Sequence, residues 1–289
     1  MSIAVQFIAL AAIFSFIEGL WPSSRAHKWW RRPLLVDLCA WLVHPLTLGA
    51  GIALAAAAAN TLSAMIPPHG LWLIITSLQE MVIEWPSWIQ IAVAFLLADF
   101  FSYWIHRAYH HFPALWSFHV VHHTSEELDW LSTSRLHPVS QVVDTAIVAI
   151  ILLLLGIPVT AVVAANIIIG ASALLVHANV RWNFGFVQNL LVSPLFHQWH
   201  HACVDEKSRN HIGNYGAALS IWDRLFETRS LPGLKRPARF GVEDGPRATL
   251  LELVVHPFRV CCNLACKLNS QAPRRTPQQA ANDSSGISR

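Results

Sequence analysis

Charged residues are scarce in this chain. Asp, Glu, Lys and Arg make up only 13% of its 289 residues, whereas hydrophobic residues make up 54%. Soluble domains carry about 25% charged residues. The shortage excludes an ordinary water-soluble protein and predicts a chain largely embedded in a membrane. The net charge of +3 is small, and we expect no nucleic-acid partner.

Several common motifs are also missing. The five cysteines form no CxxC pair, which argues against a zinc ribbon or a thioredoxin-type site. There is no HExxH motif, which disfavours a zinc protease. Glu-x-x-His pairs are absent from the apolar segments, which disfavours a soluble carboxylate di-iron bundle. The apolar N-terminus lacks a basic n-region and a cleavage site, so we interpret it as a retained transmembrane helix.

Five apolar stretches approach the roughly 20 residues that span a bilayer as a helix. They are residues 3–21, 36–59, 88–105, 139–156 and 158–176. The shorter segment Leu71–Ile83 is predicted to be interfacial or re-entrant. Every Lys and Arg lies within 25–32, 107–135 or from 181 onward, which this helix order places on one side. The positive-inside rule makes that side cytoplasmic.

The predicted fold is all-α, a polytopic helical membrane protein with a cytoplasmic helical cap that carries a histidine cluster. Residues 1–87 form N-terminal transmembrane helices and the interfacial segment, and residues 88–248 form the domain with the histidines. Residues 249–289 form an interfacial helix followed by a disordered tail rich in Ser, Gln, Pro and Arg. The sequence leaves the oligomeric state open.

Histidine is abundant, with 16 residues, and most of them fall into dense motifs. His106 and His110 form HxxxH, while residues 119–123 and 197–201 each form HxxHH. Helical residues at i, i+3 and i+4 share a face, so each motif can aim several imidazoles at one point. The helix order brings these motifs, His137 and His177 to one membrane face. Buried imidazoles without partners are costly, so the pattern predicts a multinuclear metal site. The eight to ten histidines are enough for two ions, and two irons are the favoured choice, although zinc or manganese stays compatible with the sequence.

The motifs resemble those of the fatty acid hydroxylase/sterol desaturase superfamily of integral-membrane di-iron enzymes. The likeness runs from about residue 98 to residue 228. It includes Asp99 to Arg107, His119 to Glu126, Arg135-Leu-His137-Pro138, His177-Ala-Asn179, His197 to His201, Asn214-Tyr-Gly216 and Trp222 to Phe226. Such a combination of motifs is highly specific for the family.

The resemblance implies a set of metal ligands and supporting residues. The ligands it implies are His106, His110, His119, His122, His123, His177, His197, His200 and His201, with His137 as a tenth ligand or as a residue that supports the ligands. His111, which adds a third histidine to the first motif, is expected to support the site from behind the ligands, together with Asn179 and Asp223. No catalytic side chain beyond the ligands and no organic cofactor is expected.

The resemblance also implies a reaction. Two Fe ions and O₂ as co-substrate would hydroxylate, or desaturate, an aliphatic C–H bond of a membrane lipid or sterol-like substrate. The chain has no pattern for haem, flavin or an iron–sulfur cluster, so a separate reductase, ferredoxin or cytochrome must supply electrons. The alternatives are an ether-lipid-cleaving monooxygenase and a non-catalytic membrane protein that binds metal or lipid.

Overall fold

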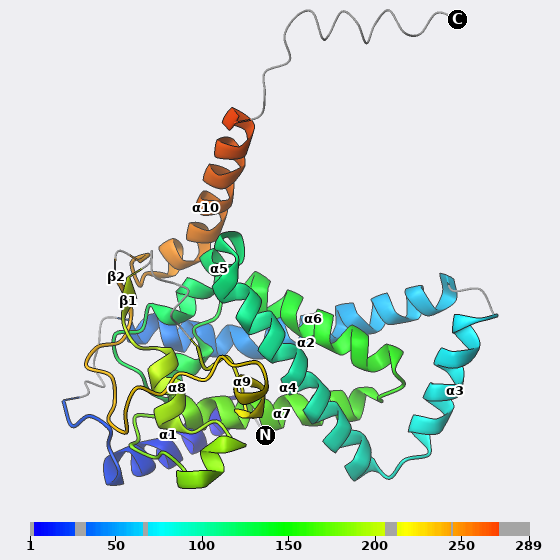
Figure 1. Ribbon diagram of the computed structural model, residues 1–289, viewed down its shortest axis with the longest axis horizontal. Helices are drawn as coiled ribbons and strands as arrows, with labels where there is room; N and C mark the ends of the chain where they lie inside the picture. Colours follow the sequence, from blue (N-terminus) through cyan, green and yellow to red (C-terminus); the bar gives the residue numbers. More distant parts are fainter. Residues whose placement is uncertain (1–2, 27–32, 66–68, 206–212, 244, 272–289) are drawn as a thin grey trace, which may run out of the picture.

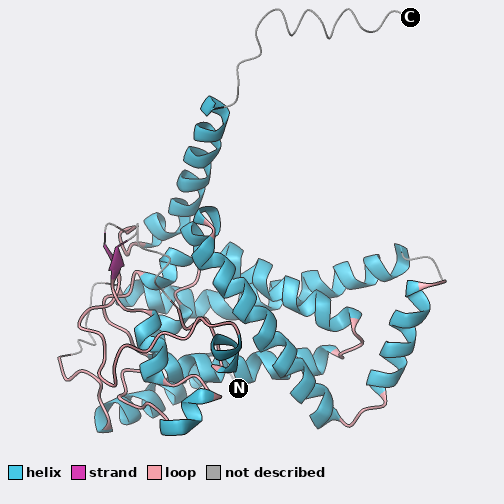
Figure 2. Ribbon diagram, in the orientation of Figure 1, coloured by secondary structure: helices cyan, strands magenta, loops and turns pink. Residues whose placement is uncertain are grey.

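The structure is a computed structural model, and it describes residues 3–26, 33–65, 69–205, 213–243 and 245–271. The predicted all-α class is confirmed, because helices dominate and one short pair of strands is the only sheet in the described part (Figure 2). The elements are α1 (Ile3–Leu20), α2 (Leu34–Met65), α3 (Leu71–Ile83), α4 (Ser87–His111), α5 (Pro113–His123), η1 (Trp130–Ser134), α6 (Pro138–Leu154), α7 (Val159–His177), η2 (Gly185–Asn189), α8 (Pro194–His200), β1 (Val204–Asp205), α9 (Ile221–Leu225), β2 (Val242–Glu243) and α10 (Leu250–Gln271).

The bundle is built from the apolar helices. Within the described residues, α2, α4 and α7 are long and apolar enough to cross a membrane, whereas α1 and α6 are shorter apolar helices. Three of the five predicted spans therefore have full length. The other two also form helices, but they are short because α1 ends at Leu20 and α6 ends at a turn around Gly156, whose φ is +85°.

Small residues allow the helices of the bundle to pack closely. α2 lies along α6, and α4 packs against α7. Their buried contact includes Ala55, Ala94, Ala149 and Ala161, and Gly51 of α2 faces Thr145 of α6 so closely that a Cβ would lie 2.7 Å from the threonine Cβ. Small side chains of this kind let helix backbones approach inside a bilayer, where the hydrophobic effect contributes little.

Helix α3 joins the far end of α2 to the start of α4. Figure 1 shows it running across the end of the bundle that is remote from α8. Its 13 residues are too few to span a bilayer, as expected. Its position at the membrane surface stays a prediction.

The opposite end of the bundle carries a cap made of α5, η1, α8, α9 and the intervening loops (Figure 1). Proline occupies the first turn of α5, α6 and α8, where its missing N–H costs no helical hydrogen bond. Ser193 caps α8, since its side chain accepts a hydrogen bond from the backbone N–H of Phe196 at 3.2 Å. These signals fix where each helix of the cap begins.

Buried polar contacts join the N-terminal helices to the rest of the chain. Glu18 at the end of α1 accepts hydrogen bonds from the backbone N–H groups of Trp130 and Asn179. Asp37 near the start of α2 pairs with Arg135 at 2.6 Å. The N-terminal helices thus share one core with the histidine domain. The boundaries predicted at residues 87 and 248 stay predictions.

Helix α10 continues beyond the body and contacts it mainly through α5 (Figure 1). Its bounds, Leu250–Gln271, agree with the predicted helix, and Leu251 and Phe258 on its surface are exposed. The tail predicted to be disordered, residues 272–289, lies outside the described residues.

Candidate metal centre

Four helices deliver the motif histidines to one end of the bundle. His106 and His110 lie one turn apart near the end of α4, and His177 is the last residue of α7. α5 carries His119, His122 and His123, and α8 carries His197 and His200, followed directly by His201. The prediction that segments far apart in sequence meet at one face is thereby confirmed.

The histidines form two groups that could each hold a metal ion. Their ligand nitrogens lie within 4.8 Å of one another in each group. The first group, called the five-histidine group, is His106, His110, His119, His123 and His200, and the second, called the four-histidine group, is His122, His177, His197 and His201. The groups adjoin, since the ring centroids of His123 and His201 are 4.4 Å apart.

Each HxxHH motif contributes to both groups. On α5, His119 and His123 enter the five-histidine group, whereas His122 enters the other. On α8, His197 and the following His201 enter the four-histidine group, whereas His200 enters the five-histidine group. Residues at i and i+4 lie nearly above one another, while adjacent residues are about 100° apart around a helix. One helical turn can therefore serve two ions.

The rings are buried, and many of their nitrogens lack a hydrogen-bond partner. These are Nε2 of His106, His119, His123 and His200, both nitrogens of His110, and Nδ1 of His122, His197 and His201. In the four-histidine group the Nε2 atoms approach each other, at 3.0 Å between His177 and His122 and 3.1 Å between His197 and His177. Buried polar atoms without partners are rare and costly. The donor set fits a metal that accepts imidazole, such as Fe, Zn, Cu or Ni.

Backbone carbonyls hold three of the rings. Nδ1 of His106 donates to the carbonyl of Tyr215, that of His200 to Gly213 and that of His177 to Ala173, each at 2.8 Å. A carbonyl can only accept, so Nδ1 carries the proton and Nε2 presents its lone pair. Hydrogen bonds of this kind orient histidine ligands in metal sites.

Two buried aspartates fix the loop that supplies the carbonyls of Gly213 and Tyr215. Asp223 accepts from the backbone N–H groups of Tyr215 and Gly216, at 2.7 and 2.8 Å. Asp99 on α4 accepts from the N–H groups of Ala218 and Leu219. The loop is therefore tied to the same helix that carries His106. Burial raises the pKa of Asp223, and the three hydrogen bonds that its carboxylate accepts oppose this shift.

The structure places the remaining predicted site residues as follows. His137 lies in neither group: its Nδ1 accepts from the N–H of Val139 at 3.2 Å, and its Nε2 contacts the carbonyl of Val254 at 3.1 Å. Both nitrogens contact backbone groups, which caps α6 and holds α10, so we leave His137 out of the proposed ligand set. His111 is exposed and stacks edge-on against Phe112. The side chain of Asn179 is hydrogen-bonded to both backbone groups of Ser24.

The supporting role expected of Asp223 agrees with its contacts, although it acts through the backbone of Tyr215. The carbonyls of Tyr215 and Gly213 were not singled out in the sequence. The Asn-Tyr-Gly element gave a signal there, because Gly216 has no room for a side chain, with a Cβ lying 2.4 Å from the carbonyl oxygen of Leu219.

A methyl group at Gly213 is expected to disturb the centre. An alanine Cβ there would lie 2.0 Å from the carbonyl oxygen of Thr228, so Gly213→Ala must displace the carbonyl that binds His200. We expect a loss of about 1–3 kcal/mol in unfolding free energy and weaker metal binding, measured by thermal unfolding and metal titration. Gly170→Ala is the control, since nothing lies within 4 Å of that Cβ. Equal behaviour of the two variants would contradict this account.

The buried histidines of α5 and α8, together with His201, are expected to make the metal-free protein less stable at acidic pH. Burial first, and neighbouring histidine charges second, lower the pKa of His119, His122, His123, His197, His200 and His201. Below the unfolded value of about 6.5, the unfolded chain binds more protons than the folded one, so stability falls as pH falls. We expect the unfolding midpoint of chelator-treated protein to decrease between about pH 7.5 and about pH 5. A flat profile would contradict neutral buried rings.

The apolar helical bundle and the paired histidine groups define a histidine-cluster membrane protein. Residues 91–228 of this chain, a little under half of its length, match the model of the fatty acid hydroxylase family. The matched segment contains all nine histidines of the two groups. No solved structure matches the chain.

The curated proteins to which this chain is similar carry the names of lipid or sterol enzymes. Ornithine lipid hydroxylase OlsE of Rhizobium tropici is 30% identical over 61% of this chain and 52% of its own length. Alkylglycerol monooxygenase of Homo sapiens is 34% identical over 47% of this chain and 29% of its own. Methylsterol monooxygenase 1 of Danio rerio is 25% identical over 47% and 45%. The chain thus spans about half of these relatives' length or less.

Proposed function

We propose that this protein is an O₂-dependent di-iron oxidoreductase that hydroxylates an aliphatic C–H bond of a membrane lipid. The single observation that carries the proposal is the pair of buried histidine groups, each with its ligand nitrogens within 4.8 Å. Iron is favoured among the metals that accept imidazole because the related proteins are named hydroxylases and monooxygenases. The proposed ligands are the nine histidines of the two groups, without His137.

Groups of the chain around the two histidine groups would position the imidazole rings and keep water out of the site. Hydrogen bonds to Tyr215, Gly213 and Ala173 fix the tautomers of three rings, and Trp116 packs on His110 and His123 with centroids 5.0 and 5.3 Å away. When bound, iron would supply activation of O₂ for C–H cleavage. A dry, shaped cavity limits side reactions. Electrons come from a separate reductase, ferredoxin or cytochrome, and the cap faces the cytoplasm.

Metal analysis combined with lipid mass spectrometry tests the proposal. Protein purified with its metal should contain about two iron ions per chain, and cells that express it should contain a lipid heavier by one oxygen. A lipid lighter by two hydrogens would instead assign desaturation. Protein that binds no iron, or unchanged lipids and sterols in the presence of O₂ and a reductant, would favour the non-catalytic alternative.

Ether-lipid cleavage is the second candidate, because 34% identity to alkylglycerol monooxygenase extends over 140 residues. Hydroxylation next to an ether oxygen would release an aldehyde from the alkyl chain. Supplying an alkylglycerol and assaying for that aldehyde separates the two reactions.

A further inference from the structure

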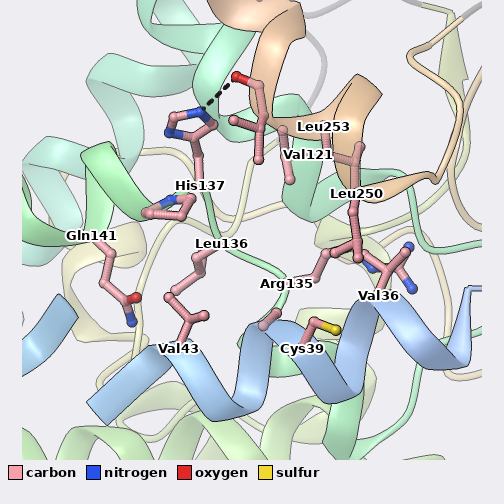
Figure 3. Close-up of a pocket in the computed structure, with 13 residues that line it drawn as sticks. Val36, Cys39, Val43, Val121, Arg135, Leu136, His137, Gln141, Leu250 and Leu253 are labelled. Atoms are coloured by element: carbon pink, nitrogen blue, oxygen red, sulfur yellow. Dashed lines mark hydrogen bonds between the residues drawn. The ribbon is translucent and has the colours of Figure 1, made fainter. Parts of the chain in front are cut away.

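A cavity lies beside the metal centre, where α2, α5, α6 and α10 meet (Figure 3). Its volume is about 120 Å³. The residues that line it are Val36, Cys39, Ala40, Val43, Val121, Arg135, Leu136, His137, Pro138, Gln141, Leu250, Leu253 and Val254. Figure 3 shows α2 along one side and α10 along the other. Its lining is mostly apolar, and Val121 directly precedes the ligand candidate His122.

One polar atom of this lining has no partner. Arg135 is 1% exposed; its Nε donates to Asp37 at 2.6 Å and its Nη1 to Thr124 at 3.2 Å, but its buried Nη2 has no hydrogen-bond partner in the described structure. A buried donor is stabilised by any oxygen that accepts from it. Since Asp37 already balances the guanidinium charge, a neutral carbonyl oxygen fits better than a second anion.

The other lining side chains that carry polar nitrogen or oxygen atoms are already engaged, and Cys39 adds a thiol, which is only a weak hydrogen-bond donor. Gln141 is hydrogen-bonded to Thr47 and His44, and both nitrogens of His137 contact backbone groups, one of them the carbonyl of Val254 (Figure 3). Arg135 is therefore the polar contact that the cavity offers to a ligand.

The volume of the cavity limits the size of the group that it can enclose. Sites that enclose compact drug-sized molecules measure about 300–1,000 Å³, well above 120 Å³. A volume of this size matches part of one alkyl chain better than a fused ring system. Leu250 and Val254 at its edge are 42% and 45% exposed, so the rest of a chain can continue outward along α10.

We propose that this cavity binds one alkyl chain of an amphipathic lipid, with an ester or amide carbonyl accepting a hydrogen bond from Nη2 of Arg135. The lipid is either the substrate or a resident lipid that joins α10 to the bundle. This site does not depend on bound metal, so it can be tested apart from the proposed function.

The native thiol of Cys39 reports occupancy of the cavity. Full-length protein held in amphipol is labelled with N-ethylmaleimide, and modification is followed at each cysteine by peptide mass spectrometry. Monopalmitoylglycerol should slow the labelling of Cys39 about tenfold and leave Cys262, which is exposed on α10, unchanged. Cholesterol should protect neither. Unprotected Cys39 with monopalmitoylglycerol, or equal protection by cholesterol, would overturn the proposal.

A cavity-filling variant with a matched control gives a second test. Val43→Trp fills the cavity from α2, whereas Leu46→Trp places the same ring on a surface position of α2 that is 70% exposed. With a photoreactive monoacylglycerol, cross-links to the 36–43 and 250–254 peptides should fall about tenfold in the first variant and persist in the second. Equal yields in both variants would overturn the site.

Turnover separates the two sources of the lipid. If the cross-linked monoacylglycerol gains an oxygen in iron-loaded protein supplied with O₂ and a reductant, the cavity holds substrate. If it stays intact while another lipid is oxidised, the cavity holds a resident lipid. Protection of Cys39 without oxidation of any lipid would reject the proposed function and leave the cavity assignment standing.

Discussion

Replacing His200 by alanine is expected to reduce turnover by about 10³-fold or more, because a metal ion contributes several kcal/mol to transition-state stabilisation. His200 belongs to the five-histidine group, and its ring is held by the carbonyl of Gly213. Removing it opens one metal position but leaves the four-histidine group intact. Bound iron should therefore fall from about two ions toward about one, measured by metal analysis beside single-turnover kinetics.

His111→Ala is the matched control for this prediction. His111 directly follows His110 in α4, but it is exposed and belongs to neither group. We expect normal iron content and turnover from it. Full turnover by the His200 variant, or equal losses in both variants, would remove the basis of the proposed centre.

Replacing Asp37 by alanine is expected to destabilise the protein by about 3–5 kcal/mol, because it leaves a buried guanidinium without its charge partner. Asp37 and Arg135 are 0% and 1% exposed, and their pair joins α2 to the segment before α6. Thermal unfolding in detergent measures the loss. A double change, Asp37→Leu with Arg135→Met, should recover much of it, since two apolar side chains can replace a buried pair.

The surface pair Arg239–Glu243 provides the comparison. Its side chains are 71% and 51% exposed, and pairs of this kind contribute about 0–1 kcal/mol. Glu243→Ala should therefore leave the unfolding midpoint nearly unchanged. A similarly small effect of Asp37→Ala would mean that Arg135 finds another acceptor.

The bundle and the nine histidines that it gathers could be predicted because hydropathy and the HxxxH and HxxHH spacings are local properties of the chain. The ends of α1 and α6 lie within two residues of the predicted ends, because Gly156 and Pro158 mark the turn after α6 in the sequence itself. Tertiary contacts also decided that α2 packs along α6. The hydropathy of the sequence does not indicate which helices pack against each other.

The contacts of His137 could not be predicted from its motif. Its position beside Arg135 suggested a ligand, but its ring caps α6 and contacts the carbonyl of Val254 on α10. A ring nitrogen already engaged with backbone is unavailable to a metal ion. Nothing in the sequence pairs α10 with this residue, since they lie 117 positions apart.

The sequence by itself determined the class of fold, the membrane character and the identity of the nine histidines, because helix period and residue chemistry act over a few positions. Only the tertiary structure decided which imidazoles gather in each group, why His122 and His123 lie in different groups, and which carbonyls orient the rings. Those outcomes depend on the rotation of four helices about their own axes and on a loop held by Asp99 and Asp223, and such distant packing is not encoded in any single motif.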